Sequence, residues 1–394
     1  MLEQIRNRFI QYGWLTPALL PLTMLGGRGL FNSVFHLYIL WALLSARTLR
    51  IADQRVYLTL QMLLLGGYAL GIPFALDPAL AVKRWGSFVL YVASALITLA
   101  MIQQDRDNLR RLLALFGVAG LFALGFAYLD LIWLLLTTEA FVPRLQMAPV
   151  HLIIYTPFTL AWLWSRTPPG YRRATGVLTF LALVAGYTVF SEERASFIGL
   201  LCAIAGFFVL IVQTRPRRAL VLVVAATLVA LALNGQGLLR GLSSEGDLFS
   251  RLDEFSSYRL SLWTQALEHP PEHPLIGVGM GNVQHYDAVV LIIGNKVRHL
   301  HNLWLDAWYD TGLIGLTLLI ALIGYGLVSI ARAWKTLPAT ARYPAGILLA
   351  AALTLLAQAQ FSISYASREI GIYFFICLAL LSHLAQQARQ PGPT

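Results

Sequence analysis

Long runs of apolar residues follow one another along most of this chain, and they constrain its fold more than any other feature. Many approach the roughly 20 residues that a helix needs to cross the hydrocarbon core of a bilayer. Only 12% of the residues are charged and the mean hydropathy is +0.66, whereas soluble domains carry about 25% charged residues. We therefore expect an all-α integral membrane protein.

The apolar runs predict about twelve transmembrane helices. They lie at residues 14–25, 30–46, 56–76, 85–104, 112–135, 152–165, 176–191, 195–213, 219–234, 308–332, 343–362 and 370–386. The first run is short, contains Pro17 and Pro21, and could also be the core of a signal peptide. We interpret it as a span because no small-residue cleavage pattern follows it.

The distribution of Lys and Arg predicts the orientation, because cytoplasmic loops carry an excess of these residues. With the N-terminus inside, 18 of the 29 Lys and Arg residues fall on the cytoplasmic side. Five of the remaining 11 lie in one long loop, where the rule is weak. Both termini are therefore expected in the cytoplasm. The net charge of +10 then reflects topology, and nucleic-acid binding is not needed to explain it.

One long polar stretch interrupts the apolar runs and divides the chain. We expect nine spans in residues 1–234, a large, partly helical outer loop in 235–307, and three spans with a cytoplasmic tail in 308–394. The loop holds five of the eight histidines as well as recurring aromatic residues, so we expect a folded cap on the membrane. Within it, Ser256 and Ser257 could cap a helix that begins near Tyr258 and ends before Pro270.

Two arginines on the outer side are candidates for binding an anion. Arg194 lies in the short junction between the seventh and eighth spans, and Arg259 lies at the start of the predicted helix in the loop. An arginine so close to a bilayer is costly to desolvate, and an anionic partner would offset that cost. Arg194 could instead pair with Glu192 or Glu193, and Arg259 could belong to a solvated helix face.

A second candidate group is Arg298-His299-Leu300-His301-Asn302, just before the tenth span. If this is the top of a helix, Arg298, His301 and Leu305 share one face. Histidine can accept a proton near neutral pH, so His301 or His299 could be a general base, and spacing alone does not choose between them. Asp130, near the outer end of the fifth span, is either functional or paired for structural reasons.

Three further patterns have structural interpretations. His269 and His273 have the spacing of a zinc pair, but the two prolines after His269 exclude the helix that would align their rings. No metal or cofactor is therefore expected. Gly277-Val-Gly279 follows no strand, so a turn with close backbone approach is favoured over dinucleotide binding. Trp263 is expected to pack in the core of the loop.

Five motifs follow one another on the predicted outer side of the chain. They are Ser-Glu-Glu-Arg-Ala at 191–195, Arg259-x-x-x-Trp263, Pro-Leu-Ile-Gly-Val-Gly at 274–279, His301-Asn302-x-x-Leu305 and Gly312-x-x-Gly315. In this order, they resemble the O-antigen ligase and O-antigen polymerase superfamily, and most of all an O-antigen ligase. The long loop between the ninth and tenth spans matches as well. Asp310 is a departure, because glutamate is expected before this last glycine pair.

The resemblance implies an inverting, metal-independent glycosyltransferase of the bacterial inner membrane, with its active site on the periplasmic face. The donor would be O-antigen polysaccharide on undecaprenyl pyrophosphate, and the acceptor a sugar hydroxyl of lipid A–core. His301 is our choice of general base. The planar guanidinium group of arginine can bind two phosphate oxygens of the donor at once. The expected donor-binding residues are Arg194 and Arg259, with Arg298 and Arg84 as helpers. Candidate supporting residues are Trp263, Asn302, Asp130, Gly277 and Gly279.

Other functions remain open at the level of the sequence. An O-antigen polymerase or a protein O-oligosaccharyltransferase of the same superfamily would use the same donor and differ in the acceptor. A flippase or transporter of lipid-linked oligosaccharides belongs to another class. Transporters place polar residues at mid-membrane and often show repeated halves. Here the polar residues cluster outside and no repeat is visible, which favours an enzyme.

The predicted orientation can be tested with a single cysteine in the long loop. Ser244→Cys should react with a membrane-impermeant thiol reagent in intact cells whose outer membrane has been permeabilised, because residues 235–307 are expected in the periplasm. The unsubstituted protein, with Cys202 and Cys377 in apolar runs, is the control. Labelling that requires lysis of the inner membrane would reverse the orientation.

Overall fold

The computed structural model describes residues 2–20, 22–23, 27–46, 49–105, 107–137, 149–191, 193–239, 242, 246–286, 291–292, 295–362 and 367–389. The helices are α1 (Leu2–Tyr12), α2 (Leu15–Leu19), α3 (Gly27–Leu44), α4 (Arg55–Leu70), α5 (Pro78–Gln104), α6 (Asp107–Thr137), α7 (Pro149–Arg166), α8 (Tyr171–Phe190), α9 (Arg194–Gly206), α10 (Pro216–Leu238), α11 (Leu248–Phe255), α12 (Arg259–Glu268), α14 (Leu303–Ala333), α15 (Ala339–Ala359) and α16 (Arg368–Gln387). Shorter elements are the 3₁₀ turns η3 (Ile72–Phe74) and η5 (Val283–His285), the π-helical turn η4 (Phe207–Ile211), and an antiparallel hairpin of β1 (Leu291–Ile292) and β2 (Asn295–Lys296).

The long apolar helices make this a multi-pass membrane protein. Within the described ranges, eight helices are long and apolar enough to cross a bilayer, and shorter apolar stretches lie in α3 and α10. The expectation of a helical membrane protein is therefore confirmed, whereas the number twelve stays a prediction. Where the sequence predicts a span at 14–25, the structure describes α2, which has five residues and is too short to cross a bilayer by itself.

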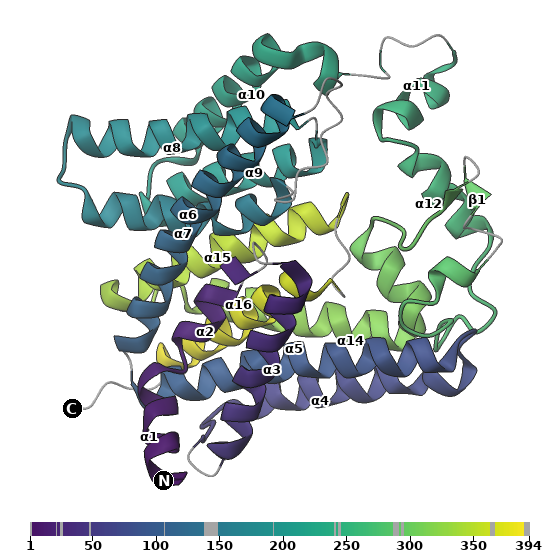
Figure 1. Cartoon of the computed structure of the whole chain (residues 1–394), viewed down its shortest axis with the longest axis horizontal. Helices are drawn as coiled ribbons and strands as arrows, with labels where there is room; N and C mark the ends of the chain where they lie inside the picture. Colours follow the sequence, from purple (N-terminus) through teal and green to yellow (C-terminus); the bar gives the residue numbers. More distant parts are fainter. Residues whose placement is uncertain are drawn as a thin grey trace.

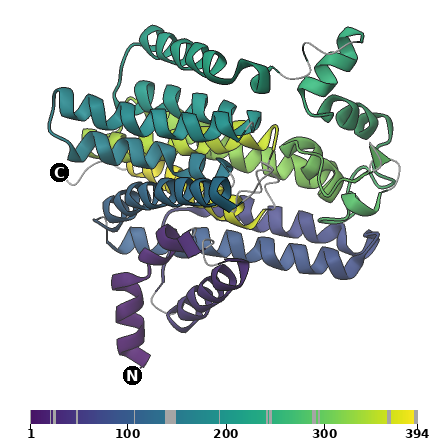
Figure 2. The ribbon, with the colours of Figure 1, turned by 45° about the horizontal axis from the view of Figure 1, so that its top comes forward.

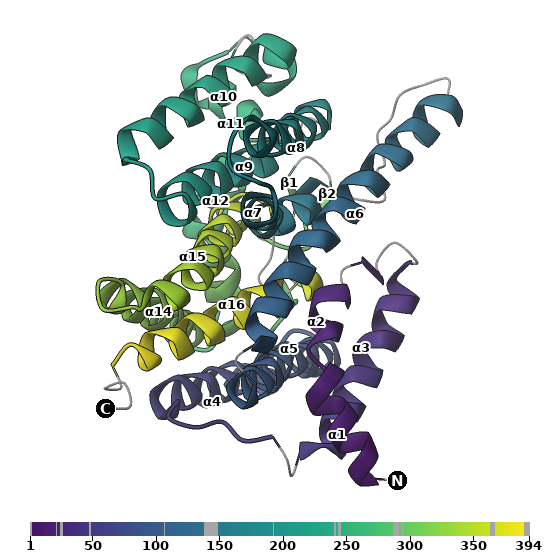
Figure 3. The same ribbon diagram turned by 90° about the vertical axis from the view of Figure 1, so that its left-hand side faces the viewer.

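The helices form one bundle with a separate cap at one end. α16 lies at the centre, between α5, α14 and α15, and α7 packs between α6, α9 and α15 (Figures 1 and 3). Figure 2 shows α1 and α3 on one side of the bundle and α10 on the opposite side. The start of α1 and the last turn of α16 lie away from the end that carries α11, α12 and the β1–β2 hairpin. This end, residues 246–302, is called the cap below.

A break in α14 fastens the cap to the bundle. Gly312 leaves the helical conformation, with φ 65° and ψ −172°. Beyond the break, the N–H groups of Leu313 and Ile314 donate to the carbonyls of Pro274 and Leu275, at 2.9 and 3.1 Å. The break would otherwise leave these N–H groups without acceptors in their own helix, and buried backbone groups need a partner, which the cap supplies here.

The predicted glycine turn packs against this break, as expected from its close backbone approach. Gly277 and Gly279 have positive φ angles, +75° and +90°. A side chain at Gly277 would meet the carbonyl oxygen of Tyr309, and one at Gly279 would meet Ala75. The N–H of Val278, between them, donates to the Tyr309 carbonyl at 2.8 Å. These glycines are therefore structural in this fold.

Gly312→Ala should destabilise the protein. The substitution places a Cβ against the backbone of Leu275 and forces an L residue into a conformation that costs on the order of 1–3 kcal/mol. The thermal midpoint of the purified protein in detergent should fall clearly. Gly324→Ala is the matched control, since it lies in the same helix with no neighbouring atom within 4 Å of the added Cβ. Equal midpoints for the two variants would show that α14 does not need its break.

Candidate functional site

Four segments that are distant in the sequence meet where the cap joins the bundle. They are the α8–α9 junction, the start of α12, the residues before α14 and the end of α15. The side chains that interact there, called the basic site below, are Glu193, Arg194, Arg259, His299 and His301. All five are partly buried.

Arg194 connects the bundle to the cap. It is the first residue of α9, and α8 ends at Phe190, which confirms the predicted tight junction. Its guanidinium donates to the carbonyl oxygen of Phe255 and lies 5.0 Å from the centroid of the Phe255 ring. Phe255 is the last residue of α11. A positive charge is thereby held close to the apolar bundle without being fully buried.

Arg259 is placed by the start of α12. Its N–H donates to the Ser256 hydroxyl at 3.2 Å, and its Nη1 donates to the Ser256 carbonyl at 3.3 Å. The Ser256 hydroxyl thus accepts from the first turn of α12, as predicted, although the residue directly before the helix is Tyr258, whose side chain makes no capping hydrogen bond. The predicted helix end before Pro270 is confirmed, because α12 stops at Glu268. Burial lowers the pKa of Arg259, Glu193 opposes that shift and Arg194 adds to it. Arginine stays protonated in proteins, so two interacting guanidinium groups concentrate positive charge here.

His301 adopts an unusual backbone conformation that directs its ring toward the end of α15. Its φ is +53°, a left-handed value that is uncommon for residues other than glycine. Its Nδ1 lies 3.2 Å from the Ser362 carbonyl oxygen. A carbonyl can only accept a hydrogen bond, so Nδ1 carries the proton of the neutral ring and Nε2 is left as an acceptor. This is the protonation state that a general base requires.

The surroundings of His301 keep its ring neutral. Burial lowers its pKa below the ordinary value of 6.5, the nearby Arg259 lowers it further, and the hydrogen bond to Ser362 opposes both. The His301 ring centroid lies 4.0 Å from that of His299. At pH 7 the lone pair on Nε2 is therefore available.

His299 differs from His301 in its hydrogen bonds, because its Nδ1 already accepts one. This nitrogen accepts the His301 N–H at 3.3 Å. An ion pair with Asp306, whose Oδ2 lies 4.0 Å away, would need a protonated ring instead. Burial, His301 and Arg259 lower the pKa of His299 to about 3, so the neutral ring is favoured. The two rings therefore differ in their hydrogen bonds, and the choice of His301 as the base stays a prediction.

Trp263 and Asn302 position the histidine segment. The Trp263 indole donates to the Leu300 carbonyl at 2.9 Å, as expected for a residue packed in the cap. The Asn302 side chain accepts from the N–H groups of Trp304 and Leu305 and caps α14. The helix therefore begins at Leu303, and the expectation that Arg298, His301 and Leu305 share a helical face is wrong. Because the Asn302 side chain caps α14 at its first residue, the helix does not extend back to His301.

Glu193 and Ser362 are residues whose roles the sequence did not reveal. Glu193 accepts hydrogen bonds from the hydroxyls of Ser196, at 2.9 Å, and Ser362, at 3.1 Å. Ser362 thus connects His301 to Glu193, although it lies 169 positions after Glu193 in the chain. The motif at 191–195 drew attention to Glu193, but only as a partner for Arg194. Glu192 lies outside the described residues. No sequence signal distinguished Ser362.

The remaining sequence candidates lie elsewhere or have no contact with His301 in the described part of the chain. Arg84 lies against Gly281 and interacts electrostatically with Asp310, whose carboxylate accepts the Gly281 N–H at 2.9 Å. Arg298 is exposed. Asp130 interacts electrostatically with Tyr187, as does Glu193. Of the four expected donor-binding arginines, Arg194 and Arg259 are therefore the two that the structure brings together.

A metal would need ligands that the described residues do not gather. No group of three or more His, Cys, Asp and Glu side chains is placed to hold an ion in that part of the chain. Chemistry without a metal remains a prediction.

The fold and the site thus define a multi-pass membrane protein with a basic, histidine-containing site under a cap. Comparison with known proteins shows which family the segment that contains this site resembles. Residues 178–320 match the family described as O-Antigen ligase, so the resemblance found in the sequence is confirmed for this segment. The segment includes Arg194, Arg259 and His301.

A curated relative agrees with this match. It is an O-antigen ligase from Pseudomonas aeruginosa, 29% identical over 171 residues. The alignment covers 43% of this chain and 38% of that protein. The chain therefore spans well under half the length of this relative, and the activity of the whole relative is not transferred by the match alone.

Replacing Arg259 with glutamine should raise the pKa of His301. The change removes a positive charge that disfavours the protonated ring, while burial still keeps the pKa below 6.5. NMR titration of protein with isotope-labelled histidine measures the shift, with the signal assigned by its loss in His301→Gln. Arg298→Gln is the control, because Arg298 is exposed and is not among the causes of the His301 shift. An unchanged His301 pKa in Arg259→Gln would show that the charge of Arg259 does not act on the His301 ring.

Proposed function

We propose that this protein is an inverting, metal-independent glycosyltransferase, an O-antigen ligase. It would transfer O-antigen polysaccharide from undecaprenyl pyrophosphate to a sugar hydroxyl of lipid A–core on the periplasmic face. The observation that carries the proposal is the accepting Nε2 of neutral His301 close to Arg259, which itself interacts with Arg194. All three residues lie in the segment that matches the O-Antigen ligase family.

The donor would bind through its pyrophosphate. Arg194 and Arg259 each present a planar guanidinium, which suits paired phosphate oxygens. Their mutual repulsion is a cost in the empty site, and a bound dianion would relieve it. They would also stabilise the negative charge that develops on the pyrophosphate as it leaves.

The acceptor hydroxyl would be activated by His301. Nε2 takes the hydroxyl proton while the hydroxyl oxygen forms a bond to the anomeric carbon of the donor sugar. The bond between that carbon and the pyrophosphate oxygen breaks, and the pyrophosphate keeps the electron pair. Attack from the side opposite the leaving group inverts the anomeric centre. The proton on His301 then passes to water.

Polymerase and protein O-oligosaccharyltransferase activities share this donor chemistry, so the test must identify the acceptor. Purified protein is incubated, with EDTA present throughout, with lipid-linked O antigen and lipid A–core. We expect a ligated lipopolysaccharide ladder on a gel. Lengthened donor without ligation would indicate a polymerase, and glycosylation of added protein an oligosaccharyltransferase. Transfer that occurs only when magnesium or manganese replaces the EDTA would refute the metal-free mechanism. The absence of any transfer both with EDTA and with added metal would favour a flippase.

Substitutions in the same assay separate the proposed roles. His301→Ala should lower turnover by about a hundred- to ten-thousand-fold and leave donor binding largely intact. Arg259→Ala and Arg194→Ala should weaken both, since each removes a charge-assisted contact worth roughly 1.5–3 kcal/mol. Lysine at either position should rescue only partly, because an ammonium cannot make the bidentate contact.

Two histidine controls complete the series. His299→Gln keeps an acceptor for the His301 N–H and should retain most activity. His285→Gln changes an exposed histidine of the cap and should have no effect. An inactive His299→Gln combined with an active His301→Ala would mean that the base has been assigned to the wrong histidine.

A further inference from the structure

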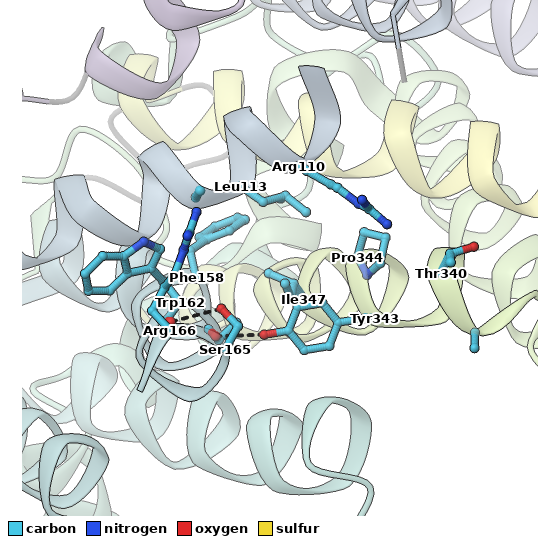
Figure 4. Close-up of a pocket in the computed structure, with 13 residues that line it drawn as sticks. Arg110, Leu113, Phe158, Trp162, Ser165, Arg166, Thr340, Tyr343, Pro344 and Ile347 are labelled. Carbon is cyan, nitrogen blue, oxygen red and sulfur yellow. Dashed lines mark hydrogen bonds between the residues drawn. The ribbon is translucent and has the colours of Figure 1, made fainter. Parts of the chain in front are cut away.

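A pocket of about 420 Å³ lies at the other end of the bundle, between the start of α6, the end of α7 and the start of α15 (Figure 4). It is lined by 13 residues. A second pocket, of about 320 Å³, shares Arg110, Thr340 and Pro344 with it. The basic site contributes no residue to either pocket, so the proposed reaction does not account for them.

Two arginines give the larger pocket a positive charge. Arg110 of α6 and Arg166 of α7 both line it, and Figure 4 shows them on either side of Leu113. No aspartate or glutamate is among the 13 lining residues. The neighbouring Arg111 points to a different partner, Asp105, at 3.6 Å. The smaller pocket adds one acid, Asp107. The net charge across the two pockets is still positive.

Apart from Ser165 and Thr340, the rest of the lining is apolar or typical of a membrane interface. Phe158 and Ile347 form part of the wall, as do Trp162 and Tyr343. The Tyr343 hydroxyl donates to the Ala161 carbonyl at 2.7 Å. Trp and Tyr are enriched where a bilayer meets water. A free phosphate ion would use the arginines but leave this apolar wall in contact with water.

We propose that this pocket binds the phosphate headgroup of an anionic phospholipid from the surrounding leaflet. Arg110 and Arg166 bind the phosphate, and the upper part of the acyl chains lies along Leu113, Phe158 and Ile347. Basic pockets between transmembrane helices on the cytoplasmic side are suited to anionic headgroups, and the distribution of Lys and Arg predicts that this end faces the cytoplasm. The site is separate from the proposed donor and acceptor sites and does not rest on the proposed function.

The test measures lipid binding by the full-length protein. Purified protein in neutral detergent is titrated with fluorescent phosphatidylglycerol and, separately, with phosphatidylcholine carrying the same chains. We expect phosphatidylglycerol to bind at least about ten-fold more tightly. The double variant Arg110→Gln and Arg166→Gln should lose that preference. Both arginines are exposed, so neither substitution leaves a buried group unpaired, and a thermal midpoint measured without lipid verifies the fold.

The matched control removes the same charge from outside the pocket. Arg172→Gln with Arg217→Gln changes two exposed arginines on the same predicted face and should keep the preference for phosphatidylglycerol. An equal loss in both double variants would indicate general surface charge and overturn the site. Displacement of the lipid by millimolar glycerol phosphate would show that a free phosphate suffices, and would overturn the lipid assignment. Ligation activity is a separate readout, so this proposal and the proposed function can fail independently.

Discussion

The hydrogen bonds at the break of α14 are the constraint on which the rest of the site depends. A helix in a bilayer satisfies its own backbone groups, and an interruption leaves them without partners unless another segment supplies them. Here Pro274 and Leu275 accept from the residues beyond Gly312. The same contact fixes the loop that follows α12, and with it the position of the cap over the bundle. The cap is therefore attached through the membrane helix itself.

From that anchor, a series of local contacts determines the position of His301. The Trp263 indole donates to the Leu300 carbonyl, and the Asn302 side chain caps the start of α14. His301 lies between Leu300 and Asn302 and is held in a left-handed conformation. Ser362 then fixes which ring nitrogen carries the proton. Ser362 also donates to Glu193, so the end of α15 and the start of α9 support the histidine from the bundle side. Few of these contacts are exposed to solvent, which favours a rigid arrangement.

The sequence predicted the parts of this structure that depend on local chemistry. Apolar runs located the long helices, and Ser256 with Pro270 bounded α12, because caps and prolines act within a few residues. The break at Gly312 was not predicted, because an isolated glycine at the start of an apolar run can equally lie in an uninterrupted helix. The apolar run predicted that α14 starts at 308, but it starts at Leu303. The Asn302 side chain caps the helix there, so the helix begins before the apolar run does. The contacts of Ser362 join residues far apart in sequence, and no periodicity encodes them.

The proximity of Arg259 and His301 has a consequence for the order of events. A guanidinium beside the ring makes the empty site a poor proton acceptor. An anion that neutralises this guanidinium would raise the basicity of Nε2 at the moment when a leaving group is in place. Under the proposed reaction, the enzyme would bind its donor before it could activate a hydroxyl, giving an ordered kinetic mechanism. The same coupling would suppress the activation of water while the donor is absent.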